Sequence, residues 1–522
     1  MKLHTKTLNF LTGMLKGTDG PARSHRRNQS KRRLSVTLQT ETLEDRRLMT
    51  TTINHDPNPP LYLVPGTPAW FQSNMSDPGV RNLAEGDFAN HSSLTRADML
   101  GIFSEVEGQG AMTANELHDL RFLVANGGVL DMPADVEFEA NRLVNSDAVT
   151  YQGNYIGYLQ VGSSVSLQVE LVDKYFLGLD HPVAAANYSN AFSTTTANAP
   201  MAAIGGTANS ANSSGGGGLY VGSGPSYLNV HQGNLGDCWL MGSLAAVAAS
   251  HPTLINYMFT DDGAAQETVT IPNTHIQQTV QVEIWSVRFF MPNGNACYVT
   301  VDSMLPDGGG YYDHPSVTGD LGNGSLWAAL AEKAYVQANG DGLVQSNLTF
   351  DNAYAALAGG DPDWALQAVV GTQASYVVNP SNVMAALGQQ ENIIVMDTGA
   401  TVANSNLVTT HSYALVYVNP AASSPFELYN PWGTNSANVA PYTFNGHSVW
   451  GQFTTTQAFL TQNFIGSTNS ARNTAAGTDA TFLPPITTTW QPGGVHDEVF
   501  SEMSSFDPRF VKGSTDLADW LD

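Results

Sequence analysis

The chain has 522 residues, enough for about two to four domains, and 42% of them are hydrophobic, enough for a sizeable core. Residues 1–50 hold 11 of the 21 basic residues and only 4 of the 46 acidic ones, so the remainder is strongly acidic and repels nucleic-acid phosphates. The longest apolar run, 244–249, is far shorter than the about 18 residues of a membrane-spanning helix. We therefore expect no nucleic-acid partner and no transmembrane segment.

The first segment, residues 1–50, is a basic N-terminal extension that we expect to be disordered or to serve in targeting. Its apolar patch, 8–11, is too short for the core of a standard signal peptide. Residues 43–49 resemble N-terminal extensions on some large bacterial proteins thought to be exported. The sequence leaves two locations open, the cytoplasm or export through an atypical extension, and it does not indicate an oligomeric state.

Residues 51–185 are expected to form a small, mainly helical domain, because apolar residues recur at helical spacing in 98–103 and 116–123. The stretches 87–98 and 105–116 carry acids at the first and last positions of a calcium-binding loop. Their starts are too close together for a normal EF-hand pair. Degenerate EF-hand-like loops and simple helix-capping acids therefore both stay open.

The next segment, 186–218, is expected to be a low-complexity flexible linker, because Ala, Ser, Thr, Asn and Gly bury too little apolar surface to offset their ordering entropy. Residues 219–465 form a mixed block, and 466–522 are expected to be a flexible C-terminal tail rich in Thr, Ser, Gly and Pro. The helices and strands expected in the block are a helix after Cys238, a helix over 326–335, and strands over 282–290, 297–302, 412–418 and 426–429.

Of the two cysteines, Cys238 lies in the more informative stretch. It follows a Gly-rich turn and lies in the first turn of a predicted helix. There the helix dipole favours the thiolate, which is the reactive form of cysteine. Gln232, six residues upstream, is placed to direct its amide N–H at an oxygen beside the sulfur, as an oxyanion hole requires. Cys297 lies in a strand-like apolar run and is expected to be a buried small hydrophobe.

A thiolate nucleophile needs a base, and the base needs an orienting group. His411 opens the strand 412–418 and Asn430 follows the strand 426–429, so a hairpin would bring both side chains to the same open end. The amide oxygen of Asn430 would then accept from the imidazole and fix its tautomer, while Trp432 would shield that bond from water. Cys, His and Asn in this order, with Gln six residues before the Cys, is the arrangement of papain-like proteases.

The sequence resembles the calpain-type cysteine proteases, whose nucleophile segment reads Gln-Gly-x-Leu-Gly-Asp-Cys-Trp. Residues 232–239 fit every fixed position of that pattern. Further matches lie at 287–290, 301–306, 326–327, 332–335 and 430–433. The resemblance implies an α+β chain with a two-lobed papain-like catalytic core, made of a helical Cys lobe and a β-rich His/Asn lobe and preceded by the small helical domain.

The resemblance also implies a role for each matched residue. These roles are nucleophile for Cys238, base for His411, orienter for Asn430, oxyanion donor for Gln232, and support for Trp239 and Trp432. The implied activity is that of a cysteine endopeptidase, which hydrolyses protein substrates through a thioester acyl-enzyme. The family usually has Gly before the His, whereas this chain has Thr410.

No cofactor is required for this chemistry, but the resemblance implies calcium as an activator that brings the two lobes into register. The ligands of such an ion cannot be assigned from the sequence. We expect any calcium effect to arise from acids around the cleft between Cys238 and His411, and the helices of 70–185 to cover that cleft.

Two other functions stay open. The same triad serves an acyl transferase or cross-linking enzyme, in which an amine replaces water as the acceptor. A non-catalytic binding module with the calpain fold is the third alternative, although such a module would not need all four groups.

Overall fold

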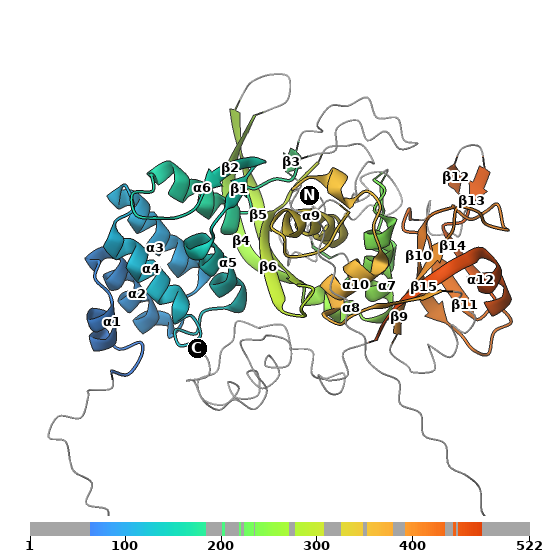
Figure 1. Cartoon of the computed structure of the whole chain (residues 1–522), viewed down its shortest axis with the longest axis horizontal. Helices are drawn as coiled ribbons and strands as arrows, with labels where there is room; N and C mark the ends of the chain where they lie inside the picture. The colour runs from blue at the N-terminus through green and yellow to red at the C-terminus, as the bar shows by residue number, and fades with distance from the viewer. Residues whose placement is uncertain are drawn as a thin grey trace, which may run out of the picture. The chain divides into compact units, whose positions relative to one another are not determined.

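The computed structural model describes residues 63–183, 201–203, 219–220, 224–233, 235–270, 277–306, 325–347, 352–378, 392–433, 442–444 and 447–471. These residues form a mixture of helices and antiparallel strands, in agreement with the predicted α+β class (Figure 1). The basic extension 1–50 lies outside the described residues. None of the described helices is long and apolar enough to cross a bilayer.

Six helices occupy most of residues 63–183 and share one hydrophobic core, in which Phe71, Ile102 and Leu123 are fully buried. The elements are α1 (Pro68–Asn74), α2 (Pro78–His91), α3 (Arg96–Gln109), α4 (Ala114–Ala125), α5 (Ala134–Asn145), the hairpin of β1 (Val149–Tyr151) and β2 (Asn154–Gly157), and α6 (Val165–Tyr175). The helical spacing of apolar residues in 98–103 and 116–123 therefore predicted α3 and α4 correctly.

Two of the four acids that suggested calcium loops are helix caps, and the other two, which begin the stretches 87–98 and 105–116, lie within α2 and α3. Asp98 forms a capping box with Thr95 at the start of α3, and Glu116 forms the same box with Thr113 at the start of α4. In each box the carboxylate accepts from the backbone N–H of the threonine, and the threonine hydroxyl accepts from the backbone N–H of the acid. The capping alternative is confirmed, and the expectation of degenerate EF-hand-like loops is corrected.

The described part of 219–378 combines helices with a three-stranded antiparallel sheet in the order β4-β5-β6. The elements are α7 (Cys238–Ser250), α8 (Pro252–Asn256), β4 (Phe259–Thr270), β5 (Gln277–Phe290), β6 (Ala296–Asp302), α9 (Trp327–Gly340) and α10 (Pro362–Val370). The two helices and two strands predicted here are confirmed, whereas β4 and α10 were not expected. Cys297 lies on β6 and is fully buried, as predicted.

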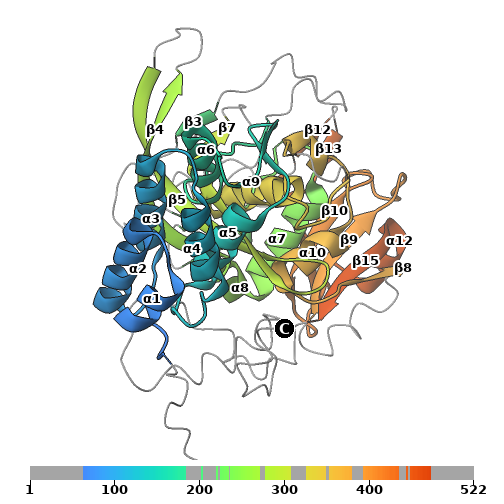
Figure 2. The same cartoon turned by 60° about the vertical axis from the view of Figure 1, so that its left-hand side comes forward.

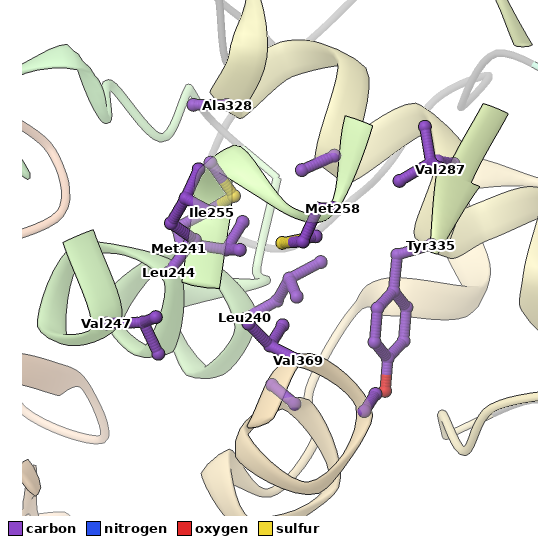
Figure 3. Packing of buried hydrophobic residues seen from close by; sticks show 14 of the residues in the cluster. Leu240, Met241, Leu244, Val247, Ile255, Met258, Val287, Ala328, Tyr335 and Val369 are labelled. Carbon is purple, nitrogen blue, oxygen red and sulfur yellow. The ribbon is translucent and has the colours of Figure 1, made fainter. Parts of the chain in front are cut away.

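Helix α7 is the centre of this part of the core. Its residues from Trp239 to Ala248 are buried on every side, so the helix has no solvent-facing stripe. Figure 3 shows Leu240 and Leu244 of α7 packed near Ile255 of α8 and Val369 of α10. Because apolar neighbours surround α7, its first residue is held in a fixed position at the edge of the core.

A six-stranded, fully antiparallel sheet lies beside α7, in the order β14-β11-β10-β9-β15-β8 (Figure 1). The strands are β8 (Ser375–Val378), β9 (Asn392–Thr398), β10 (Ser412–Val418), β11 (Phe426–Tyr429), β14 (Gln452–Thr455) and β15 (Phe464–Ala471), and α12 (Gln457–Asn463) precedes the last. In the register of β10 and β11, Ala414 pairs with Tyr429 and Val418 with Phe426. The predicted hairpin is therefore confirmed.

Two predicted boundaries need correction. Residues 466–471 were expected to begin a flexible tail, but they belong to β15, which hydrogen-bonds to strands on both sides. Within the predicted linker 186–218, Met201–Ala203 forms the short strand β3, which pairs with β7 (Met304–Pro306). Backbone pairing, which composition does not report, stabilises both segments. The rest of 186–218 and of the tail lies outside the described residues.

The helices α5 and α6 lie beside β6 (Figure 2), and charged and polar side chains also link them to β6 and to the end of α9. Asp341, at the end of α9, lies 3.0 Å from Nη1 of Arg142 and 3.0 Å from Nζ of Lys174. The hydroxyl of Thr300 on β6 donates to the carbonyl of Tyr175 at 2.8 Å. All described residues belong to one compact unit, Leu63–Asp522.

The chain enters β10 through a strained residue. Thr410 has a φ of +51°, in the left-handed region that disfavours L-residues by roughly 1–2 kcal/mol and is a genuine outlier for β-branched ones. Its N–H donates to the carbonyl of Gly399 at 2.9 Å, and the N–H of His411 donates to Oγ1 of Thr398 at 3.0 Å. These bonds hold the strained turn and fix the backbone direction of His411.

We predict that Thr410→Gly unfolds at a higher urea concentration than Thr410→Ala. Glycine relieves strain of roughly 1–2 kcal/mol and loses about 0.5–1 kcal/mol of backbone entropy, whereas alanine keeps the strain. The Gly variant should therefore be at least as stable as the parent protein in equilibrium unfolding followed by circular dichroism. An Ala variant more stable than the Gly variant would show that the turn is not strained.

Candidate active site

A cavity of about 450 Å³ lies where the first turn of α7 meets β9, β10 and the loop before α10. Cys238 and His411 both line it. A Cβ added at Gly242 of α7 would lie 3.5 Å from the carbonyl oxygen of Ser412, so the helix and β10 are in direct contact here. The described lining residues all fall within 236–465, so the expectation that the N-terminal helices cover the cleft is not met in this structure.

Cys238 is the first residue of α7, as the sequence predicted, and is half-buried. Burial raises the pKa of its thiol to about 11, and the carboxyl groups of Asp237 and Asp397 raise it further, while hydrogen bonding to Ser412 lowers it. Desolvation of the sulfur and the two nearby acids therefore oppose the effect of the helix N-terminus, which favours the thiolate.

His411 and Asn430 lie at the same end of the hairpin and are hydrogen-bonded, with 2.8 Å between Nε2 and Oδ1. The amide of Asn430 is held firmly, because its Nδ2 donates to the carbonyl of Trp450 at 3.2 Å and its backbone N–H to that of Gly451 at 2.6 Å. The bond to Oδ1 requires a proton on Nε2, so the lone pair of the neutral ring is on Nδ1. The predicted meeting of these two side chains is confirmed.

Aromatic rings flank the imidazole. The ring of Trp432 lies with its centroid 5.0 Å from that of His411, and the ring of Tyr413 meets the imidazole edge-on at 5.1 Å. Both His411 and Asn430 are buried, and burial lowers the pKa of His411 to about 4, with the Asn430 bond acting in the opposite direction. Trp432 thus lies where the sequence predicted a shield for the hydrogen bond.

The structure brings the cysteine and histidine into one cavity without joining them. In the part of the chain that is described, no hydrogen bond connects the sulfur of Cys238 to the ring of His411. A raised thiol pKa and a lowered imidazole pKa both favour the neutral forms. In this arrangement the neutral thiol of Cys238 and the neutral imidazole of His411 line the same cavity.

Gln232 and Trp239 have structural partners in this conformation. The side-chain Nε2 of Gln232 donates to the carbonyl of Leu235 at 2.6 Å, and Gln232 is not among the lining residues of the cavity. One of the two N–H groups of its amide is therefore occupied within the turn. Trp239 lines the cavity with a buried indole whose Nε1 donates to the carbonyl of Leu357 at 2.8 Å, which holds the loop before α10.

Sequence reasoning expected acids around the cleft but did not identify them. Asp361, Asp363 and Asp397 line it, and burial raises the pKa of Asp397 to about 7, although Oγ of Ser412 donates to its carboxylate at 2.7 Å. Asp397 lies on β9 and the other two at the start of α10, neither of which was predicted. The unbroken apolar run 393–396 is the signal that would have predicted β9, the strand that carries Asp397.

These cavity acids do not form a ready calcium site. Among the described residues, one group of three or more His, Cys, Asp or Glu side chains brings its ligand atoms within 4.8 Å of one another, and it contains none of the cavity acids. A hard cation needs several oxygens to converge at about 2.3–2.6 Å. The calcium expectation stays a prediction with no site assigned to it here.

Comparison with known proteins places this arrangement in a family. Residues 218–457 match the model of the calpain family of cysteine proteases. The chain is 24% identical over 222 residues to the calpain-2 catalytic subunit of Gallus gallus, covering 41% of this chain and 29% of the relative. Identity to the calpain-1 catalytic subunit of Rattus norvegicus is 25% over 222 residues, with coverages of 41% and 28%.

A calpain of Schistosoma mansoni is 26% identical over 231 residues, which cover 40% of this chain and 26% of that relative. The chain thus spans less than a third of the length of the relatives that it matches. The match includes Cys238, His411 and Asn430 and leaves out the helices α1–α6. The similarity to the calpain family of cysteine proteases therefore covers residues 218–457.

Proposed function

We propose that this chain is a cysteine endopeptidase that cleaves protein substrates through a thioester acyl-enzyme on Cys238. The observation that carries the proposal is the buried hydrogen bond between His411 and Asn430 at the cavity into which Cys238 opens. The match to the calpain family supports it, because that family consists of cysteine proteases. In this proposal, the helices α7–α10 belong to one lobe of the core and the six-stranded sheet forms the other.

In the proposed reaction, the thiol of Cys238 passes its proton to Nδ1 of His411, the ring nitrogen that the Asn430 bond leaves unprotonated. The sulfur attacks the substrate carbonyl, and the resulting oxyanion accepts from the backbone N–H of Cys238 at the start of α7. Gln232 joins this oxyanion hole after its N–H leaves the carbonyl of Leu235. The imidazolium then protonates the leaving amine, and water hydrolyses the thioester.

This reaction requires a closing motion. The thiol and the imidazole are not hydrogen-bonded in the described structure, so the two side chains must come together, by rotation or by a small shift of the backbone, before the proton can pass. Closure would also lower the pKa of Cys238, because an imidazolium beside the sulfur stabilises the thiolate. Calcium is the activator that the family resemblance implies, but no step proposed here depends on it.

The activity is tested with the full chain and a fluorescent casein substrate, with and without calcium, next to Cys238→Ala. We expect cleavage by the parent protein and none by the variant. A vinyl-sulfone probe that labels Cys238 while casein stays intact, together with incorporation of a primary amine into casein, would favour the acyl transferase. Absence of both cleavage and labelling would favour the non-catalytic binding module.

We predict that Asn430→Ala lowers kcat/KM by about 100-fold, since a displaced imidazole loses its near-attack geometry, whereas Cys238→Ala abolishes turnover. The matched control is Asn419→Ala, in the loop at the opposite end of the hairpin, where the side chain accepts from the N–H of Ala421. This control should retain parent activity. If Asn430→Ala has parent kcat/KM, then Asn430 is only a turn residue.

We predict that iodoacetamide alkylates Cys238 faster than Cys297 at every pH, because Cys238 reaches the cavity and Cys297 is fully buried. The rate at Cys238 should keep rising above pH 8.5, since burial raises its pKa to about 11 and the thiolate forms only as pH approaches that value. Peptide mass spectrometry measures both rates. A rate at Cys238 that is already constant from pH 6 would mean that the free enzyme holds a thiolate–imidazolium pair.

A further inference from the structure

A second group of ligating side chains lies outside the cavity, where residues that follow α6 meet the sheet of β4–β6. His181, Glu267 on β4 and Asp302 at the end of β6 each offer one ligand atom, and these atoms all lie within 4.8 Å of one another. None of the three lines the cavity of Cys238. We propose that they bind one divalent transition-metal ion of the zinc class, independently of any protease activity.

The distances suit a metal with short bonds. Nε2 of His181 is 2.6 Å from Oδ2 of Asp302 and 3.8 Å from Oε2 of Glu267. Zinc binds nitrogen and oxygen ligands at about 2.0–2.2 Å, which places neighbouring tetrahedral ligand atoms about 3.3 Å apart. The first pair must therefore open and the second close, each by less than about 1 Å.

Lys333 does not take the position of the ion. Its Nζ binds Oδ1 of Asp302 and also the carbonyl oxygens of Asp302 at 2.9 Å and Met304 at 2.8 Å. The other carboxylate oxygen, Oδ2, is thus left to the side of His181 and Glu267. Two carboxylates face one ammonium group, so the cluster with a neutral imidazole is negative and attracts a cation.

Glu267 supplies the observation that points to a missing partner. Its Oε2 is fully buried and accepts no hydrogen bond within the described residues, while the side chain as a whole is 13% exposed. Buried carboxylate oxygens normally have a donor or a cation, and a metal ion at this point would serve both carboxylates at once.

The ligand set selects the class of ion. A neutral imidazole with two carboxylates suits zinc and similar transition metals, whereas calcium takes six to eight oxygens and gains little from a ring nitrogen. Three protein ligands leave a fourth position for water. Because the ligands come from the segment after α6 and from two strands, the ion would join residues 63–183 to the sheet of β4–β6.

The test uses the full chain carrying Cys238→Ala, which removes the thiol that would otherwise bind zinc in the cavity. After treatment with a chelator, zinc binding is measured by calorimetry and by metal analysis of the dialysed protein. We expect one zinc per chain at this site, with affinity at least tenfold lower in Glu267→Gln and in His181→Ala. His118→Ala is the matched control, because its Nδ1 also faces a carboxylate, that of Asp119 at 2.8 Å; it should bind as the parent does.

Zinc should also raise the melting temperature of the Cys238→Ala protein and of the His118→Ala control, but not that of Glu267→Gln, and calcium should not displace it. The Gln variant has nearly the same shape as the parent, so its metal-free circular dichroism checks that it is folded. Parent-like zinc affinity in Glu267→Gln would overturn the proposal. So would displacement of zinc by calcium at equal concentration.

Discussion

The candidate active site depends on the hydrogen bond between His411 and Asn430. The register in which β10 pairs with β11 brings these two side chains together. Side chains alternate between the two faces of a sheet, so a slip of one residue would move His411 and Asn430 apart. The strained turn at Thr410 and the amide contacts of Asn430 fix the two ends of the bond. The pairing of these strands thus positions the side chains of the site as well as stabilising the sheet.

The same burial that orders the site also sets its protonation state. Helix α7 holds Cys238 at the edge of an apolar core, where desolvation of the sulfur raises its pKa and opposes the favourable end of the helix dipole. His411 is desolvated too, which favours the neutral ring. The acids that line the cavity add negative charge near the sulfur. A thiolate is therefore favoured only when an imidazolium is brought directly against it.

Local sequence patterns predicted the features that depend on interactions between residues close together in the chain. The Gly-rich turn before Cys238, the hairpin that joins His411 to Asn430 and the buried Cys297 all follow from short stretches of chain. Strand β15 was missed because its order comes from backbone pairing with β8 and β9. The raised pKa of Cys238 was missed because one of its causes is Asp397, which is far away in sequence. Long-range neighbours, which one sequence does not report, decide both.

Through the contacts of Asp341, the stability of the protease-like domain depends on the N-terminal helices. Burial alone would raise the pKa of Asp341, but Arg142 and Lys174 hold that pKa below the usual value. A chain that lost residues 63–183 would lose both cations and would expose the end of α9 on which they lie. Transfer of the protease-like domain to another protein would therefore have to carry these charged partners with it, or replace Asp341 by an uncharged residue.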